Sequence, residues 1–486
     1  LMKKTFVIGA GIGGIASALR LKSINHDVKI FDRCKEIGGR AQKIIVDGYQ
    51  HDTGPTVITA PYLFEELFKL FNEDIENYIN FIPLNPWYRF YFDDLSFFDY
   101  GGTKESTVNE IKKFSSRDAD GYLKMLESSK SIYEIGYDKL ATFPFHDFSS
   151  MVKIVPDMIR LRSFTNVYNH VSKYIKNENL RKAFSIQPLL VGGNPFTTTS
   201  IYCLIHYLER KDGIHFPLGG TAQIVNQLKL LLEKNNIDIK NEHSLNELNI
   251  KNKKVVSVKI NNKELKNFDN IVYNGDPITL YKKILKGNIS FKNRFLTSNV
   301  KISMGLYVLF FGTKIKYKDV PHHSIIFCKR FRELLSDIFN AKHLSNDFSL
   351  YLHRPTATDI NFAPNDCDSF YVLSPVPNLA LFNDWDSKEK LYRKEIINYL
   401  EKRLLKNLKQ NIVHEFSMTP NDFENDYLSY MGSGFSLQPT LSQSAWFRYH
   451  NKTSEASNLY LVGAGTHPGA GLPGVLNSAK LLMNII

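Results

Sequence analysis

The sequence predicts an α/β protein in which one domain is built from segments that lie far apart in the chain. Three observations predict it. Residues 5–8 form a short apolar strand that runs into a glycine-rich turn and a helix. Residues 460–462 and 474–486 provide a last strand and a last helix near the other end. Between them, residues 115–210 are mostly helical by hydrophobic period, so they separate the segments that contain strands.

The other elements follow from periodicity and from turn residues. A helix at 15–22 and a buried strand at 28–31 complete a β-α-β unit at the start of the chain. Asn261-Asn262 marks the turn of a hairpin, because asparagine tolerates the backbone conformations of tight turns. Further helices are expected at 61–71 and 221–233, and further strands at 87–100, 254–266, 268–273, 300–312 and 348–353.

Composition limits the classes of partner. The 486 residues are 43% hydrophobic, which is enough to bury a sizeable core and to form two or three domains. Lys and Arg exceed Asp and Glu by 61 to 49, which favours an anionic partner. No basic cluster accompanies a nucleic-acid-binding motif, so we expect no nucleic-acid partner. No apolar run approaches the ~20 residues that span a bilayer, so the chain is expected to lie on a membrane at most.

Cysteine and histidine spacing predicts neither a disulfide framework nor a metal site. The cysteines are widely scattered and form no C-x-x-C pair, which fits a reduced, cytosolic chain. His322-His323 is the one adjacent histidine pair, and no further histidine or carboxylate follows it at ligand spacing. The cysteines are Cys34, Cys203, Cys328 and Cys367.

A glycine motif opens the first helix. Gly9-Ala10-Gly11-Ile12-Gly13-Gly14 fits G-x-G-x-x-G, in which the first glycine permits a tight turn, the second lets a pyrophosphate approach and the last allows close helix–strand packing. The helix N-terminus offers free N–H groups to that phosphate. Asp32, followed by Arg33, ends the second strand, where an acid accepts hydrogen bonds from a ribose. The spacing predicts a dinucleotide site rather than the signal peptide that the basic, apolar N-terminus imitates.

Two further motifs resemble flavoproteins of the amine oxidase and phytoene desaturase superfamily. Gly38-Gly39-Arg40 resembles their second fingerprint, in which the arginine helps to hold the FAD diphosphate. Asp52-Thr53-Gly54-Pro55-Thr56 resembles the loop that runs beside the flavin, with Gly54, Pro55 and Thr56 at the cofactor. The resemblance implies FAD as the cofactor.

The C-terminal segment 458–475 resembles the terminal signature of bacterial-type phytoene desaturases. A strand ends at Gly463, and the glycine-rich loop after it allows a planar ring to approach the backbone. Pro473 stands where it can start a helix, whose N-terminus would stabilise the negative charge of a reduced flavin. The binding residues implied here are Gly463, Gly465, Thr466, Gly471, Pro473, Gly474 and Val475.

Three positions depart from the usual pattern of this family. Asp32 stands where the family usually has Glu, and the shorter side chain should still reach a ribose. Leu245 stands where the family usually has a Val that contacts the adenine through its backbone, and a backbone contact tolerates the change of side chain. Ala464 replaces the acid of amine oxidases and plant-type desaturases, which favours the bacterial branch. Further segments resemble the lycopene-forming enzymes, at 190–196, 216–221, 348–353 and 443–448.

The resemblance covers nearly the whole chain and implies three parts. They are a Rossmann-like FAD-binding domain from the discontinuous segments 1–80, 214–290 and 450–486, a β-sheet-rich substrate-binding domain from 81–114 and 291–449, and a helical membrane-associating insertion at 115–213.

The implied activity is FAD-dependent desaturation of phytoene, a lipophilic carotenoid, to lycopene. Each step passes a hydride to the flavin and releases a proton from the neighbouring carbon, and oxygen or a quinone takes the electrons. Abundant Phe and Tyr, 34 and 25, fit a long apolar tunnel for a hydrocarbon. The catalytic base is not identified: His467 and Arg448 lie in matching motifs, and a structural role suits each at least as well.

Two alternatives stay open. A carotenoid isomerase or a desaturase for a shorter polyene would carry the same motifs. A lipid-binding protein without enzymatic activity, similar to the Rab GDP-dissociation inhibitors, would share the fold but needs no intact flavin site. This chain keeps every glycine element of such a site, so flavin absorbance separates the two classes.

Residues 151–182 predict a basic amphipathic helix at a membrane surface. Apolar residues recur at helical spacing from Met151 to Ile175, and basic residues outnumber acidic ones. We expect peripheral binding at the cytoplasmic face of the cell membrane that weakens as salt rises, and that falls when Arg160, Arg162 and Lys173 become Glu. The alternative is a surface helix whose apolar stripe faces the core.

Overall fold

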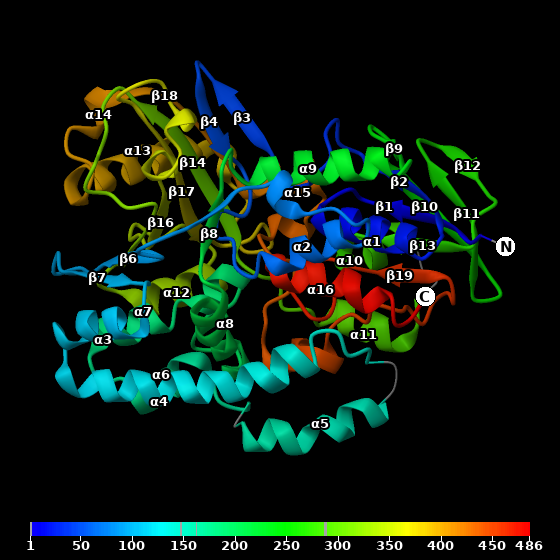
Figure 1. The fold of residues 1–486 in the computed structure, drawn as a ribbon, viewed down its shortest axis with the longest axis horizontal. Helices are drawn as coiled ribbons and strands as arrows, with labels where there is room; N and C mark the ends of the chain where they lie inside the picture. The colour runs from blue at the N-terminus through cyan, green and yellow to red at the C-terminus, as the bar shows by residue number, and fades with distance from the viewer. Residues whose placement is uncertain (1, 146–147, 162, 286–288) are drawn as a thin grey trace.

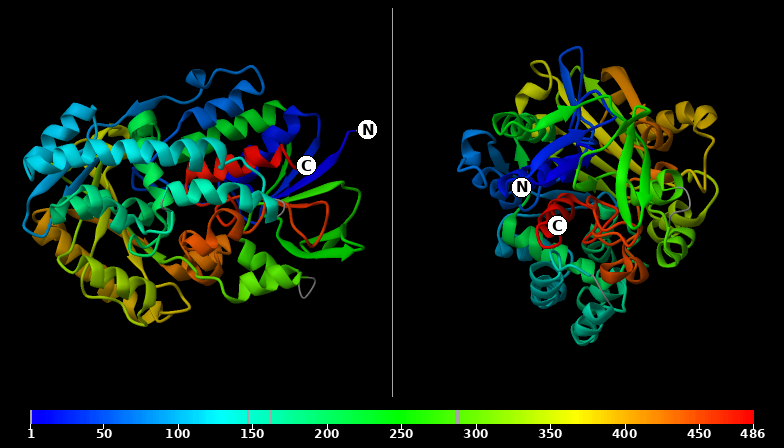
Figure 2. Two further views of the ribbon diagram at one scale, coloured as in Figure 1. Left: turned by 90° about the horizontal axis from the view of Figure 1, so that it is seen from below. Right: turned by 90° about the vertical axis from the view of Figure 1, so that its right-hand side faces the viewer.

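The protein is described by a computed structural model over residues 2–145, 148–161, 163–285 and 289–486 (Figure 1). Two sheets occupy opposite ends of an elongated molecule, and a layer of helices runs along one side of it (Figures 1 and 2). Both ends of the described chain lie at the end that holds the smaller of these two sheets.

The first sheet has five parallel strands in the order β19-β13-β1-β2-β9. Its strands are β1 (Lys4–Ile8), β2 (Asp27–Phe31), β9 (Asp238–Lys240), β13 (Asn270–Tyr273) and β19 (Leu459–Leu461). Strands β1 and β13 are almost wholly buried, as expected for parallel strands covered on both faces. Helices α1 (Ile12–Ser23), α9 (Thr221–Lys234) and α16 (Leu472–Leu482) pack together beside the sheet. Sheet formation therefore brings strands from residues 4–31, 238–273 and 459–461 into one unit.

Smaller elements surround this sheet. The predicted hairpin is confirmed, since β11 (Lys254–Ile260) and β12 (Lys263–Leu265) pair antiparallel around Asn261 and Asn262, both with positive φ. The other elements are β3 (Lys43–Val46) paired with β4 (Tyr49–Asp52), β5 (Phe81–Pro83) paired with β8 (His215–Pro217), β10 (Leu245–Lys251), α2 (Tyr62–Lys69), α10 (Pro277–Thr279) and α11 (Phe291–Ser298).

The second sheet has seven strands in the order β18-β14-β17-β16-β15-β6-β7, and only the β15–β6 pair is parallel. Val308 and Phe310 face one apolar core, whereas Leu309 and Phe311 face another, so β14 is buried on both sides. The elements are β6 (Tyr88–Tyr91), β7 (Phe97–Tyr100), β14 (Gly305–Thr313), β15 (His323–Ile326), α12 (Phe331–Asn340), β16 (Leu350–His353), β17 (Asp368–Val376), α13 (Trp385–Arg403), α14 (Leu408–Asn411), β18 (Ile412–Met418) and α15 (Pro420–Tyr427).

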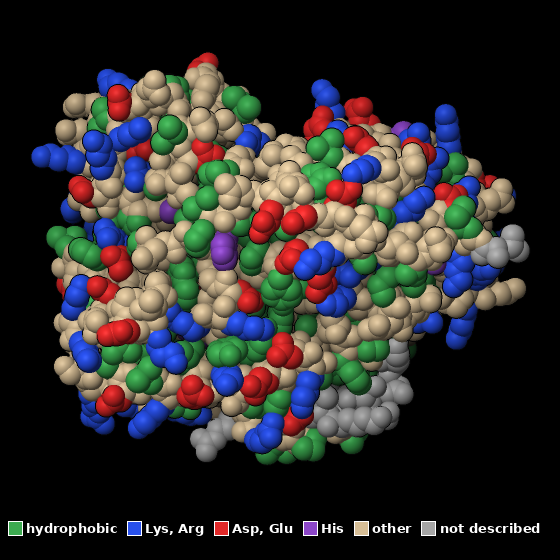
Figure 3. Space-filling view, viewed as in Figure 1, with side chains coloured by type: hydrophobic (Ala, Val, Ile, Leu, Met, Phe, Trp, Pro, Cys, Tyr) green, Lys and Arg blue, Asp and Glu red, His purple; other side chains and the backbone are tan. Residues whose placement is uncertain are grey.

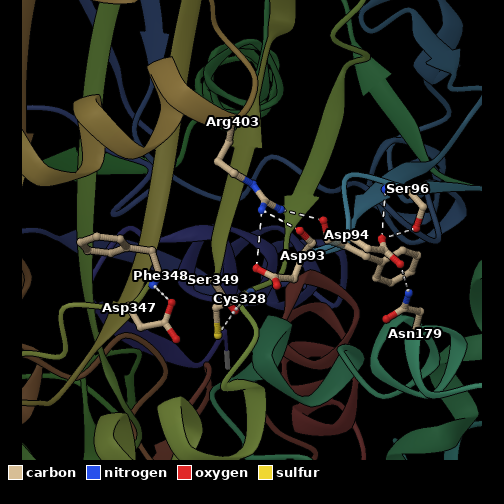
Figure 4. A network of polar contacts seen from close by, with 10 residues as sticks. Asp93, Asp94, Ser96, Asn179, Cys328, Asp347, Phe348, Ser349 and Arg403 are labelled. Atoms are coloured by element: carbon tan, nitrogen blue, oxygen red, sulfur yellow. Dashed lines mark hydrogen bonds and ion pairs between the residues drawn. The ribbon is translucent and has the colours of Figure 1, made fainter.

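The turn between β6 and β7 ties this sheet to two helices (Figure 4). Arg403, the last residue of α13, donates to the backbone oxygens of Phe92 at 2.6 Å and Asp93 at 3.1 Å. Asn179 donates from its side chain to the Asp94 carboxylate at 3.3 Å. Because β6 also lines the cavity described below, these contacts help to fix one wall of it.

The helical layer holds α3 (Lys104–Lys112), α4 (Ser116–Tyr133), α5 (Phe148–Arg160), α6 (Val167–Tyr174), α7 (Glu178–Phe184) and α8 (Leu204–Asp212). None of the helices in the described ranges has the length and apolar content needed to cross a bilayer.

The prediction of one amphipathic helix over residues 151–182 is wrong. The described residues there belong to α5, α6 and α7, because Asn166 and Asn177 each accept a backbone N–H with the side chain and start a new helix. Val171 and Ile175 are fully buried, so the second half of the apolar stripe faces the core. Arg162 lies outside the described residues.

Candidate active site

A cavity of about 640 Å³ is lined by residues of both sheets and of the helical layer. Most of the predicted site residues line it: Gly9, Gly11, Ile12, Gly13, Asp32, Arg33, Gly38, Gly39, Arg40, Gly54, Pro55, Thr56, Leu245, Gly463, Gly465, His467, Gly471, Pro473, Gly474 and Val475. Ala10, Gly14, Arg448 and Thr466 are not in its wall.

The glycine turn after β1 forms one end of the cavity. Gly9 has a φ of +98°, which favours glycine, and a Cβ on Gly14 would lie 1.9 Å from the Gly9 carbonyl oxygen. These two glycines are therefore needed to make the turn. Gly11 has different surroundings, because a Cβ there would meet only the side chain of Asn274, at 3.0 Å. Its open side leaves room for a ligand at the N-terminus of α1.

Asp32 supports that turn and also lines the cavity. It is 6% exposed, and its carboxylate accepts hydrogen bonds from the N–H groups of Ala10 at 2.5 Å and Cys34 at 2.7 Å. Each carboxylate oxygen keeps a lone pair for a further donor. Leu245, the first residue of β10, lines the same end of the cavity.

Two arginines hold the C-terminal end of α15 and the segment after it against this end of the cavity. Arg33 donates to the backbone oxygens of Asn425, at 2.7 Å, and Asp426. Arg40 donates to the Gly434 carbonyl and, at 2.6 Å, to the Ser429 hydroxyl. Burial lowers the pKa of Arg40. Both residues line the cavity, so an anion bound there could contact two arginines that are already hydrogen-bonded to residues 425–434.

The C-terminal glycine loop closes another wall. Helix α16 begins after Gly471, which has a φ of +92° and no side-chain cap, so backbone N–H groups of its first turn remain free. Arg448 is 1% exposed and braces the loop by donating to Thr466 O at 3.0 Å and Ala464 O at 2.7 Å. These contacts suit a structural role for Arg448.

His467 lies in the cavity wall with its ring against Phe145. Its Nε2 donates to the Leu140 carbonyl at 2.8 Å, and Nδ1 has no partner among the described residues. Burial lowers its pKa to about 4, so the ring holds a proton weakly at neutral pH. It is a poor acceptor for a proton released in the cavity.

The rest of the cavity wall is largely apolar and aromatic. It comes from α5, α8, the segment before α8 and the second sheet. Members include Met158, Leu161, Ile186, Leu189, Leu190, Ile201, Leu204, Leu208, Leu306, Ile325, Tyr351, Tyr371 and Leu373. Such a wall suits a ligand without polar groups.

Glu209 is the acid that sequence reasoning missed. It lines the cavity from α8, beside Leu208, and is 1% exposed. Its Oε1 accepts a hydrogen bond from the Tyr88 hydroxyl at 3.2 Å, and Oε2 has no partner within the described ranges. Burial raises its pKa to about 8. In the sequence, this acid follows the largely apolar residues 201–208, which include His206. Nothing local distinguishes such an acid from a surface residue.

The comparisons with known proteins agree with this arrangement. Over residues 12–481 the chain matches the family described as flavin-containing amine oxidoreductase. It is 40% identical to the lycopene-forming phytoene desaturase of Pseudescherichia vulneris, over 100% of this chain and 99% of that one. It is 36% identical to the neurosporene-forming phytoene desaturase of Rhodobacter capsulatus, over 100% of this chain and 94% of that one.

A solved structure has the same fold. An oxidoreductase from Methanosarcina mazei matches with a TM-score of 0.66 at 15% identity, over 99% of this chain and 100% of that one. At that identity the likeness concerns the fold alone.

Proposed function

The chain belongs to the family of flavin-containing amine oxidoreductases, and from that premise we propose that it uses FAD to desaturate phytoene to lycopene. It is an oxidoreductase that acts on CH–CH bonds in carotenoid biosynthesis. One observation carries the proposal: a single cavity joins the glycine turn of a nucleotide-binding sheet to a deep apolar wall.

The cofactor is FAD, which supplies the hydride acceptor when it is bound. The residues present fit it. The N-termini of α1 and α16 line the cavity without side-chain caps, so their N–H groups are available to a diphosphate and to an isoalloxazine ring. Asp32 can accept from a ribose, and Arg40 brings positive charge to the same wall.

The proton that leaves the substrate at each step needs an acceptor in an apolar cavity. Glu209 fits this role, because its Oε2 is unpartnered among the described residues and its pKa of about 8 makes its carboxylate a strong base there. Bound FAD would supply the hydride acceptor, and Glu209 Oε2 would take the proton from the neighbouring C–H bond, so that a carbon–carbon double bond is left in the substrate. The two electrons would then pass from the cofactor to oxygen or to a quinone.

The product assay tests the function. Purified protein with FAD, incubated with phytoene in liposomes, should carry flavin absorbance and convert phytoene to lycopene, identified by chromatography and visible spectrum. A protein that holds no flavin would favour the lipid-binding alternative. Oxidation of amines without action on phytoene would contradict the desaturase assignment, and neurosporene as the end product would correct the number of steps.

We also propose that the helical layer binds the membrane surface. Helix α5 lies at the lower edge of the molecule, where hydrophobic side chains are visible on the surface (Figures 1 and 3). Its residue Met158 and the following Leu161 line the cavity, whereas Val152 and Ile159 of the helix are 54% and 60% exposed. Helix α5 therefore separates the apolar cavity from an exposed apolar surface, which suits entry of a substrate from lipid.

A second helix extends this surface. Phe291 and Phe295 on α11 are 85% and 63% exposed. The α11 residue Lys292 lies 4.0 Å from the ring of Trp446, which packs in the same small apolar cluster as Met158 of α5. We name Val152, Ile159, Phe164, Phe291 and Phe295 the docking face. Exposed Arg160, Lys292 and Arg294 supply positive charge for peripheral binding to an anionic bilayer.

Replacing two docking-face residues should weaken membrane binding. The double variant Ile159→Glu/Phe295→Glu loses two apolar anchors, and we expect at least about a tenfold weaker partition into anionic liposomes, or ~1.4 kcal/mol. Co-sedimentation at low and high salt measures it. The matched control Ile360→Glu/Leu391→Glu changes residues that are 69% and 54% exposed on other elements, and it should bind like the parent. Equal losses in both double variants would contradict this docking face.

A further inference from the structure

Three buried histidines meet behind the cavity wall. His323 and His353 stand opposite each other in the antiparallel pair of β15 and β16, and His322 precedes β15. Their exposures are 4% for His322, 0% for His323 and 1% for His353. The ring centroids are 4.6 to 5.4 Å apart. Sheet pairing therefore gives the adjacent pair the third histidine that its sequence neighbourhood lacks.

The free ring nitrogens of these histidines point to a ligand. His322 Nε2, His323 Nε2 and both nitrogens of His353 are buried and have no hydrogen-bond partner among the described residues. Unpaired buried polar atoms are costly, and each usually has a partner such as a water or an ion. One potential ligand nitrogen from each of the three rings lies within 4.8 Å of the other two.

The remaining nitrogens of His322 and His323 are held by neighbouring hydroxyls. His322 Nδ1 lies 2.6 Å from the Thr358 hydroxyl, and His323 Nδ1 lies 2.7 Å from the Tyr351 hydroxyl. When each Nδ1–H donates to that oxygen, the Nε2 lone pair is left free. Metal-binding histidines are commonly oriented by such a bond from the second nitrogen.

We infer that His322, His323 and His353 form a binding site for a divalent transition-metal ion of the Zn²⁺ type. Three imidazoles suit Zn²⁺ and its neighbours rather than Ca²⁺ or Mg²⁺, which prefer oxygen ligands. Zn–N bonds of about 2.0–2.1 Å place tetrahedral ligands about 3.4 Å apart, so the rings close by at most about 1.4 Å on binding.

The charged neighbour of this cluster is itself paired. Arg354, which is next to His353 in the chain, donates to the Asp368 carboxylate at 3.2 Å, and both side chains are buried. The positive charge of Arg354 is therefore balanced beside the three rings.

The ion would cross-link β15 and β16 close to the cofactor site. Tyr351, which holds His323, lies with its hydroxyl 2.6 Å from the Thr56 hydroxyl. Tyr351 and Thr56 both line the cavity, whereas the three histidines do not. The site is therefore a structural one behind the wall and not a source of the desaturation chemistry.

Elemental analysis of the FAD-loaded protein, without an affinity tag, tests the site. After incubation with Zn²⁺ and removal of loose ions on a chelating resin, the parent should retain about one Zn²⁺ per chain, and Zn²⁺ should raise its thermal unfolding midpoint. His353→Gln and His322→Gln should retain less than about a tenth of that amount. His206→Gln, which changes another fully buried histidine on α8, should retain as much as the parent.

A milder variant keeps the test decisive if the histidine variants do not fold. Thr358→Val removes the acceptor of His322 Nδ1 at a residue outside the cavity wall, and it should weaken Zn²⁺ binding about 10- to 100-fold in competition with a chromophoric chelator. A folded, flavin-loaded parent that retains no Zn²⁺ would overturn the inference. So would Zn²⁺ retention that is equal in the parent, His353→Gln and Thr358→Val.

Discussion

Replacing Gly11 with Val is expected to abolish FAD binding while the chain still folds. Gly11 has φ −67° and ψ 171°, an extended conformation that Val adopts without strain. A Cβ there meets only Asn274, at 3.0 Å, so the branched side chain would project into the cavity at the N-terminus of α1. It would fill the space through which a diphosphate reaches the free N–H groups, and we expect the Kd for FAD to rise at least about 100-fold, or ~2.7 kcal/mol.

A series at the same motif separates binding from folding. Gly11→Ala adds one methyl group and should weaken FAD binding less than Gly11→Val, as measured by flavin fluorescence on titration of the apoprotein. Gly14→Ala places a Cβ 1.9 Å from the Gly9 oxygen and should destabilise the fold itself, seen in the thermal unfolding midpoint. An unchanged FAD affinity in folded Gly11→Val would show that the cofactor lies elsewhere.

The second large effect is expected from Glu209→Gln, which should lower kcat at least about 100-fold with FAD content unchanged. Glutamine preserves the shape of the side chain but cannot accept the proton at Oε2. In the parent, the pKa of about 8 leaves the carboxyl mostly protonated at pH 7. The base form grows as pH rises through 8, so kcat should rise over that range and then level off. The residual activity of Glu209→Gln should not follow this curve.

Tyr88→Phe provides the matched control for the assignment of Glu209 as the proton acceptor. The Tyr88 hydroxyl donates to Glu209 Oε1 and stabilises the carboxylate. Removing it should move the rise in kcat to higher pH without abolishing turnover. A Glu209→Gln enzyme with parental kcat, or a Tyr88→Phe profile shifted to lower pH, would show that another group takes the proton.

Local patterns predicted much of the site because their requirements are local. The turn at 9–14 needs its glycines wherever it occurs, and the cavity wall contains most residues of the motifs at 38–40, 54–56 and 463–475. Periodicity was less reliable at the helical layer. It joined 151–182 into one helix, because the hydrophobic period continues across the caps at Asn166 and Asn177 that divide it.

The sequence by itself determined the family, the cofactor and the positions of the glycine turns, since short motifs carry backbone requirements that do not depend on distant residues. Only the tertiary structure decided which polar groups are buried together. Glu209 becomes a buried acid because α8 and β6 place it against Tyr88. Arg448 binds loop carbonyls rather than facing the cavity. His353 joins His322 and His323 because two strands pair in one register. Burial and pairing arise from contacts between residues far apart in the chain, and no local pattern encodes them.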